Sequence, residues 1–360
     1  MTLPRPRPDL GALTGYHSPQ LDVAVRLNTN ESPYAPPAGF VDAWLAAVRD
    51  APLNRYPDRH ATRLRGALAE RLAQPAERVF CANGSNEVLQ TLLLSYGGPG
   101  RRVLVFEPTY ALHAHIARIT STQVVEAERT ADFVVSPTEA GIVIAAERPS
   151  VVFLCSPNNP TGTVESRATV EALLGSVVDY GPALLVVDEA YGEFAGWSAM
   201  ELIADDVPLV VVRTYSKVWS MAALRLGFAV APTPIVAVLD DVVLPYHLAV
   251  TTQLAGLEAL TFDAEMRDRV DALVTERHRL ASALTRLPNL TVYPSGANFV
   301  LVRVDGDARA LWERLVERGV LVRDFSAAPR LEGCLRITVG TPAEDDRLLD
   351  ALRESLEEAA

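Results

Sequence analysis

The chain has 360 residues, of which 49% are hydrophobic and 22% are charged, and its net charge is −12 at pH 7. This composition is typical of a soluble globular protein, and the length exceeds what one hydrophobic core usually fills, which predicts two lobes. The negative charge argues against nonspecific binding to nucleic acids or membranes. No apolar run approaches the roughly 18 residues that suggest a membrane span, so we expect neither kind of partner.

The first residues are rich in arginine and proline and lack an apolar stretch, so we expect no secretory signal. Three widely spaced cysteines, Cys81, Cys155 and Cys334, do not have metal-ligand spacing. They are typical of small core side chains in a reducing compartment, which favours the cytoplasm and no metal site.

Residues 1–34 carry few helix signals, and we expect them to form an extended arm that packs on a partner subunit or on the smaller lobe. Short apolar runs then alternate with segments that suit crossover helices, such as residues 166–180. The runs are residues 79–81, 103–106, 151–154, 184–187 and 209–212. This alternation predicts an α/β fold whose large domain, residues 35–250, holds a mostly parallel sheet covered on both faces.

The pattern changes after Pro245. Residues 264–286 predict one long amphipathic helix, and shorter strands follow at 298–304, 320–323 and 334–338. A last helix is expected from about Pro342. These elements predict a smaller α+β domain, residues 251–360, with the boundary somewhere in 240–265.

The most informative stretch follows the apolar run at 209–212. It brings Thr214, Ser216 and Lys217 to one end of a buried strand, and Arg225 follows eight residues after the lysine. A primary amine at that position can form an imine with an aldehyde cofactor, while the hydroxyls and the guanidinium can hold a phosphate. A solvated turn is the alternative for Ser-Lys taken alone.

Two further strand ends carry candidate cofactor contacts. Gly84, Ser85 and Asn86 precede an apolar-periodic segment, so a tight turn with Ser85 or Asn86 as cap would open a helix whose free N–H groups suit an anion. Tyr110, after the strand at 103–106, could stack on a flat ring or be an ordinary half-buried tyrosine.

The next two strand ends carry an amide and a carboxylate. Asn159 lies in a turn that two prolines and a glycine make rigid, which fixes the direction of its side chain. Asp188 ends a buried strand, where a carboxylate needs a cationic partner such as a pyridinium N–H; a salt bridge within the fold is the alternative. Tyr191 follows three residues later.

Taken in order, these residues resemble the fold-type-I pyridoxal-phosphate enzymes over about Leu27 to Gly340. Within that superfamily the chain is most similar to the histidinol-phosphate aminotransferase family. The segments that carry this likeness are residues 27–31, 55–58, 156–162, 188–191, 213–217, 244–247 and 335–340.

The resemblance implies pyridoxal 5′-phosphate as cofactor and a role for each matching residue. Lys217 would bind the cofactor covalently, and Asp188 would keep its pyridine nitrogen protonated. Asn159 and Tyr191 would contact the ring hydroxyl, and Tyr110 would stack on the ring. The cofactor phosphate would be held by Ser85, Asn86, Thr214, Ser216 and Arg225, together with Tyr56 of a neighbouring subunit, which implies a homodimer with shared sites.

The same likeness implies the substrates. An amine, histidinol phosphate, and the oxo acid 2-oxoglutarate would react with ping-pong kinetics, as in histidine biosynthesis. The catalytic lysine must be neutral to act as a base, and its site and cationic neighbours such as Arg225 favour this. The substrate-binding residues by this resemblance are Tyr16, Asn30, Tyr246, Arg323 and Arg336. Two guanidiniums suit a phosphate monoester better than a carboxylate.

Alternatives remain open at this stage. Trp219 and Ala223, between the lysine and Arg225, are bulkier than is usual in this family. This departure leaves room for an aromatic amino acid aminotransferase or for a decarboxylase or carbon–carbon bond-forming enzyme of the same fold. A nucleotide-binding or regulatory module is disfavoured because no Gly-x-Gly-x-x-Gly opens a strand–helix unit.

Overall fold

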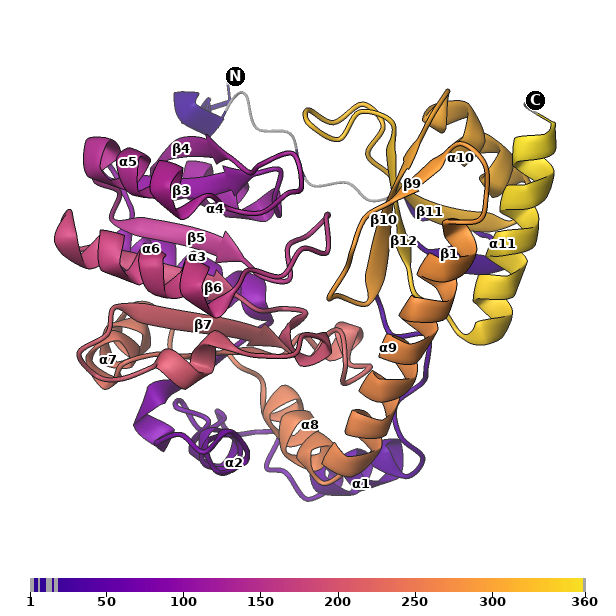
Figure 1. Cartoon of the computed structure of the whole chain (residues 1–360). Helices are drawn as coiled ribbons and strands as arrows, with labels where there is room; N and C mark the ends of the chain where they lie inside the picture. Colours follow the sequence, from indigo (N-terminus) through magenta and orange to yellow (C-terminus); the bar gives the residue numbers. More distant parts are fainter. Residues whose placement is uncertain (1–2, 6, 11–14, 16–18, 359–360) are drawn as a thin grey trace.

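The computed structural model describes residues 3–5, 7–10, 15 and 19–358. Two separate sheets dominate it, each with its own helices (Figure 1). The larger sheet has seven strands in the order β2 (Val79–Ala82), β8 (Gly227–Val230), β7 (Leu209–Thr214), β6 (Leu184–Asp188), β5 (Val151–Cys155), β3 (Arg102–Glu107) and β4 (Gln123–Glu128). Strand β8 runs antiparallel to both of its neighbours, β2 and β7, and the other neighbouring strands pair in parallel. The predicted α/β class with a mostly parallel sheet is confirmed.

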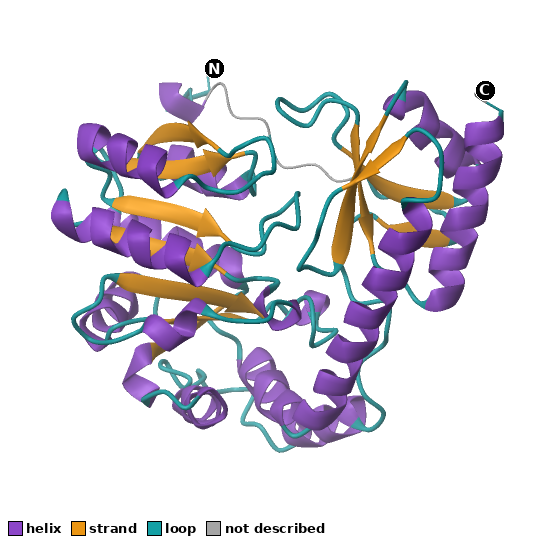
Figure 2. Ribbon diagram, in the orientation of Figure 1, coloured by secondary structure: helices purple, strands orange, loops and turns teal. Residues whose placement is uncertain are grey.

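Helices cover both faces of this sheet (Figure 2). Val103 and Val105 of β3 point to one face, where they join a core with α3 (Ser85–Tyr96), α4 (Leu112–Ile119) and α7 (Thr233–Val242). The alternate residues Leu104 and Phe106 join the core of the opposite face, with α2 (Thr62–Leu72), α5 (Pro137–Glu147) and α6 (Arg167–Asp179). A strand buried on both faces must be apolar at every position, which explains the unbroken apolar runs.

The smaller sheet has five strands in the order β1 (Val25–Leu27), β11 (Val320–Asp324), β12 (Cys334–Thr338), β10 (Phe299–Val304) and β9 (Leu290–Val292). The strand β1 pairs with β11 in parallel, so a segment near the start of the chain joins the C-terminal sheet. Helices α10 (Ala308–Glu317) and α11 (Pro342–Glu357) pack beside it.

The long helix α9 (Asp263–Leu284) runs from the neighbourhood of α1 (Phe40–Arg49) and α8 (Val250–Leu260) to the smaller sheet (Figure 1). No helix among the described residues is both long enough and apolar enough for a bilayer crossing. The three cysteines are buried and unpaired, as expected.

The fold brings the candidate site residues that follow the parallel strands to one edge of the large sheet. Strands β3, β5, β6 and β7 are parallel, so their carboxyl ends meet at the side of the large sheet that faces the smaller sheet (Figure 1). In open α/β sheets, ligands bind in the crevice outside this edge.

Candidate active site

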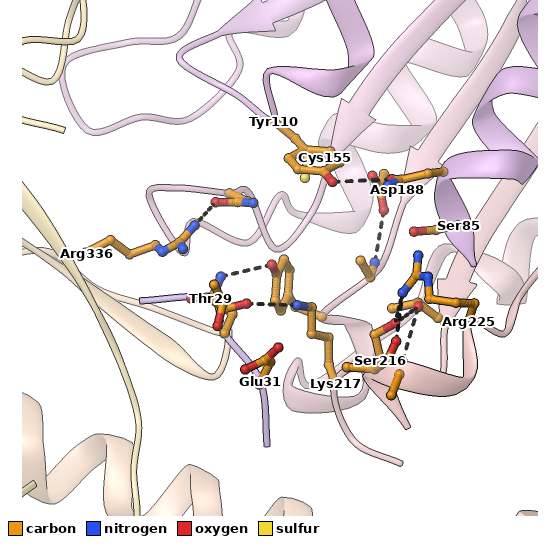
Figure 3. A pocket seen from close by; sticks show the side chains of 18 of the residues that line it. Thr29, Glu31, Ser85, Tyr110, Cys155, Asp188, Ser216, Lys217, Arg225 and Arg336 are labelled. Atoms are coloured by element: carbon orange, nitrogen blue, oxygen red, sulfur yellow. Dashed lines mark hydrogen bonds between the residues drawn. The ribbon is translucent and has the colours of Figure 1, made fainter. Parts of the chain in front are cut away.

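A cavity of about 430 Å³ opens at the carboxyl edge of the large sheet. It is lined by residues that follow β2, β3, β5, β6 and β7, by the segment Thr29–Glu31, and by Arg336 of the smaller sheet. Figure 3 shows that Ser85, Ser216 and Arg225 gather at one end of this pocket, while Arg336 lies at the other. Most sequence-predicted residues therefore meet in one place.

Lys217 reaches into the middle of the pocket (Figure 3). Its Nζ donates a hydrogen bond of 3.1 Å to the carbonyl oxygen of Thr29. Burial lowers the pKa of this amine to about 8, helped by the positive charges of Arg336 and Arg225 and opposed by Glu31. A neutral amine, the form that is nucleophilic and basic, is thus accessible near neutral pH, as the sequence predicted.

Asp188 ends β6 with a side chain that is only 2% exposed. Its Oδ1 accepts the backbone N–H of Ala190 at 3.1 Å, and its Oδ2 lies 2.9 Å from Nε2 of His113. The His113 ring stacks on Phe153 at 4.7 Å between centroids, which fixes its orientation. Sequence reasoning missed His113. Tyr110 precedes α4, whose N-cap is Ala111, so helix periodicity does not link the two residues, and the contact of His113 with Asp188 is revealed only by the folded chain.

The end of the pocket with Arg225 is built around the start of α3. Gly84 is the N-cap, with φ of 82°, and neither Ser85 nor Asn86 caps the helix through its side chain, so that expectation was wrong. This backbone conformation favours glycine, and a Cβ there would lie 2.6 Å from Nη2 of Arg225, which would have to move. Ser85 and Ser216 both line the pocket.

Hydrogen bonds hold this cluster together. Arg225 Nη1 donates to Ser216 Oγ at 3.3 Å, and Thr214 Oγ1 donates to the same oxygen at 3.0 Å. With the free N–H groups of the α3 N-terminus, these donors form a cradle suited to a phosphate.

Tyr110 and Asn159 lie between the two ends of the pocket. The Tyr110 hydroxyl donates to Asn86 Oδ1 at 3.3 Å. The loop that carries Asn159 is fastened by its neighbour Asn158, whose Nδ2 donates to the carbonyl of Pro108 at 2.9 Å and to Thr161 Oγ1 at 2.8 Å. Asn158, rather than the prolines alone, thus leaves Asn159 facing the pocket.

Tyr191 is buried, and burial raises the pKa of its phenol. Its oxygen accepts a hydrogen bond of 2.9 Å from Nδ2 of Asn30. Asn30 was predicted to bind substrate. In the structure it lines the pocket, and its amide also supports the phenol.

The two arginines predicted to bind substrate lie on neighbouring strands. Arg336 donates to Asn159 Oδ1 and, at 2.8 Å, to the carbonyl of Asn28. Arg323 is its direct partner in the β11–β12 register. Both guanidiniums lie over the Phe325 ring, at 5.7 Å for Arg323 and 5.6 Å for Arg336. They line an adjoining cavity of about 310 Å³ that also shares Tyr110 and Asn159 with the first.

Two predicted residues, Tyr56 and Tyr246, are not part of this cluster. Tyr56 and Tyr246 stack on each other, with centroids 4.5 Å apart, and neither lines the pocket of its own chain. Tyr16 lies outside the described residues.

A family profile described as aminotransferase class I and II matches residues 23–352. The chain belongs to this family. The histidinol-phosphate aminotransferase of Frankia casuarinae is 45% identical over 361 residues, covering 97% of this chain and 90% of the relative. That of Thermobifida fusca is 45% identical over 345 residues, covering 94% and 92%. The crystal structure of the Sinorhizobium meliloti histidinol-phosphate aminotransferase in complex with pyridoxal-5′-phosphate has a TM-score of 0.88, at 24% identity, and covers 100% of this chain and 99% of that one. This last likeness is one of fold.

Membership of the aminotransferase family accounts for the arrangement of the pocket. A lysine amine, a buried carboxylate and an anion cradle converge from separate strands of the large sheet. No group of three or more His, Cys, Asp or Glu side chains within the described ranges is arranged to hold a metal ion.

Proposed function

We propose that this aminotransferase transfers the amino group of histidinol phosphate to 2-oxoglutarate, with pyridoxal 5′-phosphate as cofactor, in histidine biosynthesis. Two relatives of nearly full coverage, each 45% identical, carry the name histidinol-phosphate aminotransferase. The pairing of Arg323 with Arg336 is the structural observation that carries the choice of substrate.

The pocket fits this cofactor in size, shape and charge. Lys217 offers an amine for covalent attachment, Asp188 offers a carboxylate for the pyridine nitrogen, and the Gly84 turn with Arg225 offers a phosphate cradle. When bound, the cofactor supplies an electron sink for negative charge that develops on the substrate carbon. His113 holds Asp188 in place, and Tyr191 and Asn159 lie where they can bind the ring oxygen.

Lys217 is also the proposed proton carrier. Its Nζ, with a pKa lowered to about 8, can take up the proton of the amine-bearing carbon and return it. Arg336 holds the anionic end of the substrate at the opposite side of the pocket from the phosphate cradle (Figure 3).

The two arginines favour a phosphate over a carboxylate. Directly paired residues on antiparallel strands point to the same face, so both guanidiniums can approach a single anion. A phosphate dianion offers enough acceptors for two guanidiniums. An aromatic amino acid would leave the second arginine without this role, which ranks the aromatic aminotransferase below our proposal. A decarboxylase or carbon–carbon bond-forming enzyme shares the cofactor site and is separated by its products.

A substrate screen tests this proposal. Purified protein is assayed with histidinol phosphate or with phenylalanine, each with 2-oxoglutarate, and glutamate is measured together with carbon dioxide. We expect glutamate from histidinol phosphate with at least a tenfold preference in kcat/KM, no carbon dioxide, and no turnover by Lys217→Ala. A preference for phenylalanine, or release of carbon dioxide, would refute the assignment.

We also propose a homodimer in the cytoplasm. Leu53, Tyr56, Leu244 and Tyr246 are exposed apolar side chains, and Tyr56 is 80% exposed although it stacks on Tyr246. An exposed cluster of this kind is typical of a protein interface. A second copy covering it could bring Tyr56 to the neighbouring phosphate cradle. The corresponding domain division is an arm at 1–34, a cofactor domain at 35–250 and a small domain at 251–360.

A further inference from the structure

The hydroxyl group of Tyr191 has a defined partner in the structure. Asn30 Nδ2 donates to this oxygen at 2.9 Å, and both residues are buried. A phenol carries one proton and accepts through its lone pairs. Because the amide donates, the phenol accepts on that side, and its own proton must point elsewhere.

Thr338 determines which way the Asn30 amide faces. The Thr338 oxygen accepts the backbone N–H of Asn30 at 3.0 Å, and its hydroxyl donates to Asn30 Oδ1 at 3.0 Å. If the amide were turned over, the Thr338 proton would lose this acceptor inside a buried site, which is unfavourable. Asn298 Nδ2 donates to the carbonyl of Asn30 at 3.1 Å and holds the backbone from the other side.

Thr338 itself is not a pocket-lining residue among those that the structure describes. It is 3% exposed and lies on β12, two residues after Arg336, so both side chains point to the same face of the small sheet. The two hydrogen bonds that its side chain makes among the described residues both go to Asn30, so its hydroxyl acts on the pocket through Asn30.

We propose that Thr338 is a positioning residue which, by fixing the Asn30 amide, directs the proton of Tyr191 into the pocket toward the ring oxygen of the bound cofactor. This inference rests on the proposed function. A donor that faces this oxygen stabilises its ionised form. This arrangement also makes the orientation of the Tyr191 hydroxyl, in the large domain, depend on strand β12 of the small domain.

The test follows the visible absorbance of the bound cofactor during a pH titration without substrate. Thr338→Val keeps the shape of the side chain but removes the hydroxyl, which frees the amide to turn and to accept the Tyr191 proton. We expect the midpoint of the absorbance change to rise by about one pH unit, the scale of one hydrogen bond to a charged group. Thr338→Ser retains the hydroxyl and should titrate like the parent protein.

Repeating the Thr338→Val change in a Tyr191→Phe variant separates a positioning role of Thr338 from a general structural one. In Tyr191→Phe there is no phenolic proton to direct, so adding Thr338→Val should leave the midpoint unchanged. A shift of similar size in both backgrounds would overturn the proposal. Should Thr338→Val not fold, Asn30→Asp replaces it: a carboxylate accepts from both Thr338 and Tyr191, so its midpoint should rise with Thr338 intact, and no rise overturns the proposal.

The outcome also distinguishes this inference from the proposed function. If the parent protein shows no absorbance band with pyridoxal 5′-phosphate, the proposed function itself fails. If the band is present but Thr338→Val and Thr338→Ser titrate alike, only the role of Thr338 fails.

Discussion

Lys217 shows how burial prepares a single side chain for chemistry. Burial first, and the positive charges of Arg336 and Arg225 second, lower the pKa of its amine to about 8. Only the neutral amine attacks an aldehyde. We therefore expect the rate at which apoprotein binds pyridoxal 5′-phosphate to increase as pH rises from 6 to 9, with a midpoint near pH 8. Stopped-flow absorbance measures this rate. Lys217→Ala should give no band that borohydride can fix, and a capture rate independent of pH would contradict this account.

Gly84 is the second residue whose role can be isolated. Its backbone has a φ of 82°, and an added Cβ would lie 2.6 Å from Nη2 of Arg225. Gly84→Ala should push the guanidinium out of the phosphate cradle and weaken cofactor binding about tenfold or more, the scale of one charge-assisted hydrogen bond. Equilibrium titration of the apoprotein with the cofactor measures this.

Gly175→Ala is the matched control. This glycine lies inside α6 with no atom within 4 Å of the added Cβ. The change should leave cofactor affinity unaltered and stabilise the fold by roughly 0.5–1 kcal/mol, since alanine is the better helix former. Equal cofactor affinity for the two variants would show that space at Gly84 is unimportant.

At the scale of elements, the start of α11 contains a buried carboxyl with an unusual proton affinity. Asp345 Oδ1 accepts the backbone N–H of Gly340 at 3.0 Å. Burial, together with nearby Glu276, raises the Asp345 pKa to about 8, although the Gly340 bond opposes this. The folded chain thus keeps a proton that the unfolded chain releases near pH 4. The stability from this group is complete below about pH 4 and is lost as pH rises through 8.

Asp345→Asn should remove this dependence, because the amide cannot ionise and its oxygen can still accept from Gly340. We expect the variant to match the parent at pH 4–5 and to exceed it at pH 9 by about 1–3 kcal/mol, the cost of an unpaired buried polar group. Urea unfolding at both pH values measures this. Asp345→Ala, which loses the acceptor for the Gly340 N–H, should be less stable than the parent at pH 4–5. Equal stability of the parent and Asp345→Asn at pH 9 would refute the assignment.

The elements also show which parts of the fold local sequence can predict. Strands β5, β6 and β7 and helix α6 were expected nearly at their observed bounds, because buried strands are continuously apolar and α6 begins at a Ser166 cap. Strand β1 was not expected. Its three residues become a strand through pairing with β11, nearly 300 positions away, and nothing in their own pattern indicates that pairing.

The candidate site likewise contains residues that local sequence predicts and residues that only the fold reveals. Lys217, Asp188 and Asn159 follow predicted strands, so topology alone brings them together. His113 and Thr338 act through partners that are 75 and 308 positions distant, and only the folded chain reveals these contacts. The capping role expected for Ser85 or Asn86 was wrong because Gly84 takes the N-cap position, with φ of 82° and ψ of 167°, a conformation that favours glycine.

At the scale of the whole molecule, contacts between the lobes complete the pocket. Arg336 of the small sheet bonds Asn159 of the large domain and the carbonyl of Asn28. The backbone N–H of Gly296 donates to the carbonyl of Gly162 at 2.8 Å, beside the same loop. Arg336 and the predicted cofactor-binding residues therefore share one cavity only while the two lobes remain in contact.

The proposed dimer extends this dependence to a second chain, and subunit mixing tests it. Tyr56 lies outside the pocket of its own chain, whereas Lys217 lies inside it. If each site takes Tyr56 from the partner, a dimer of one Lys217→Ala chain and one Tyr56→Ala chain contains one intact site. Random pairing of the two chains after joint refolding should restore roughly a quarter of the parent activity, because half of the dimers are mixed and each has one intact site of two.

The two variants measured separately supply the baseline for this mixing experiment. Lys217→Ala should be inactive and Tyr56→Ala should bind the cofactor more weakly. A control mixture combines Lys217→Ala with Asp188→Ala, two residues that line the same pocket of one chain. In a mixed dimer the Lys217→Ala chain spoils one site and the Asp188→Ala chain spoils the other, so no recovery is expected. Recovery in the Tyr56 mixture alone supports shared sites; activity no higher than the average of the two separate variants would show that Tyr56 serves its own chain or none.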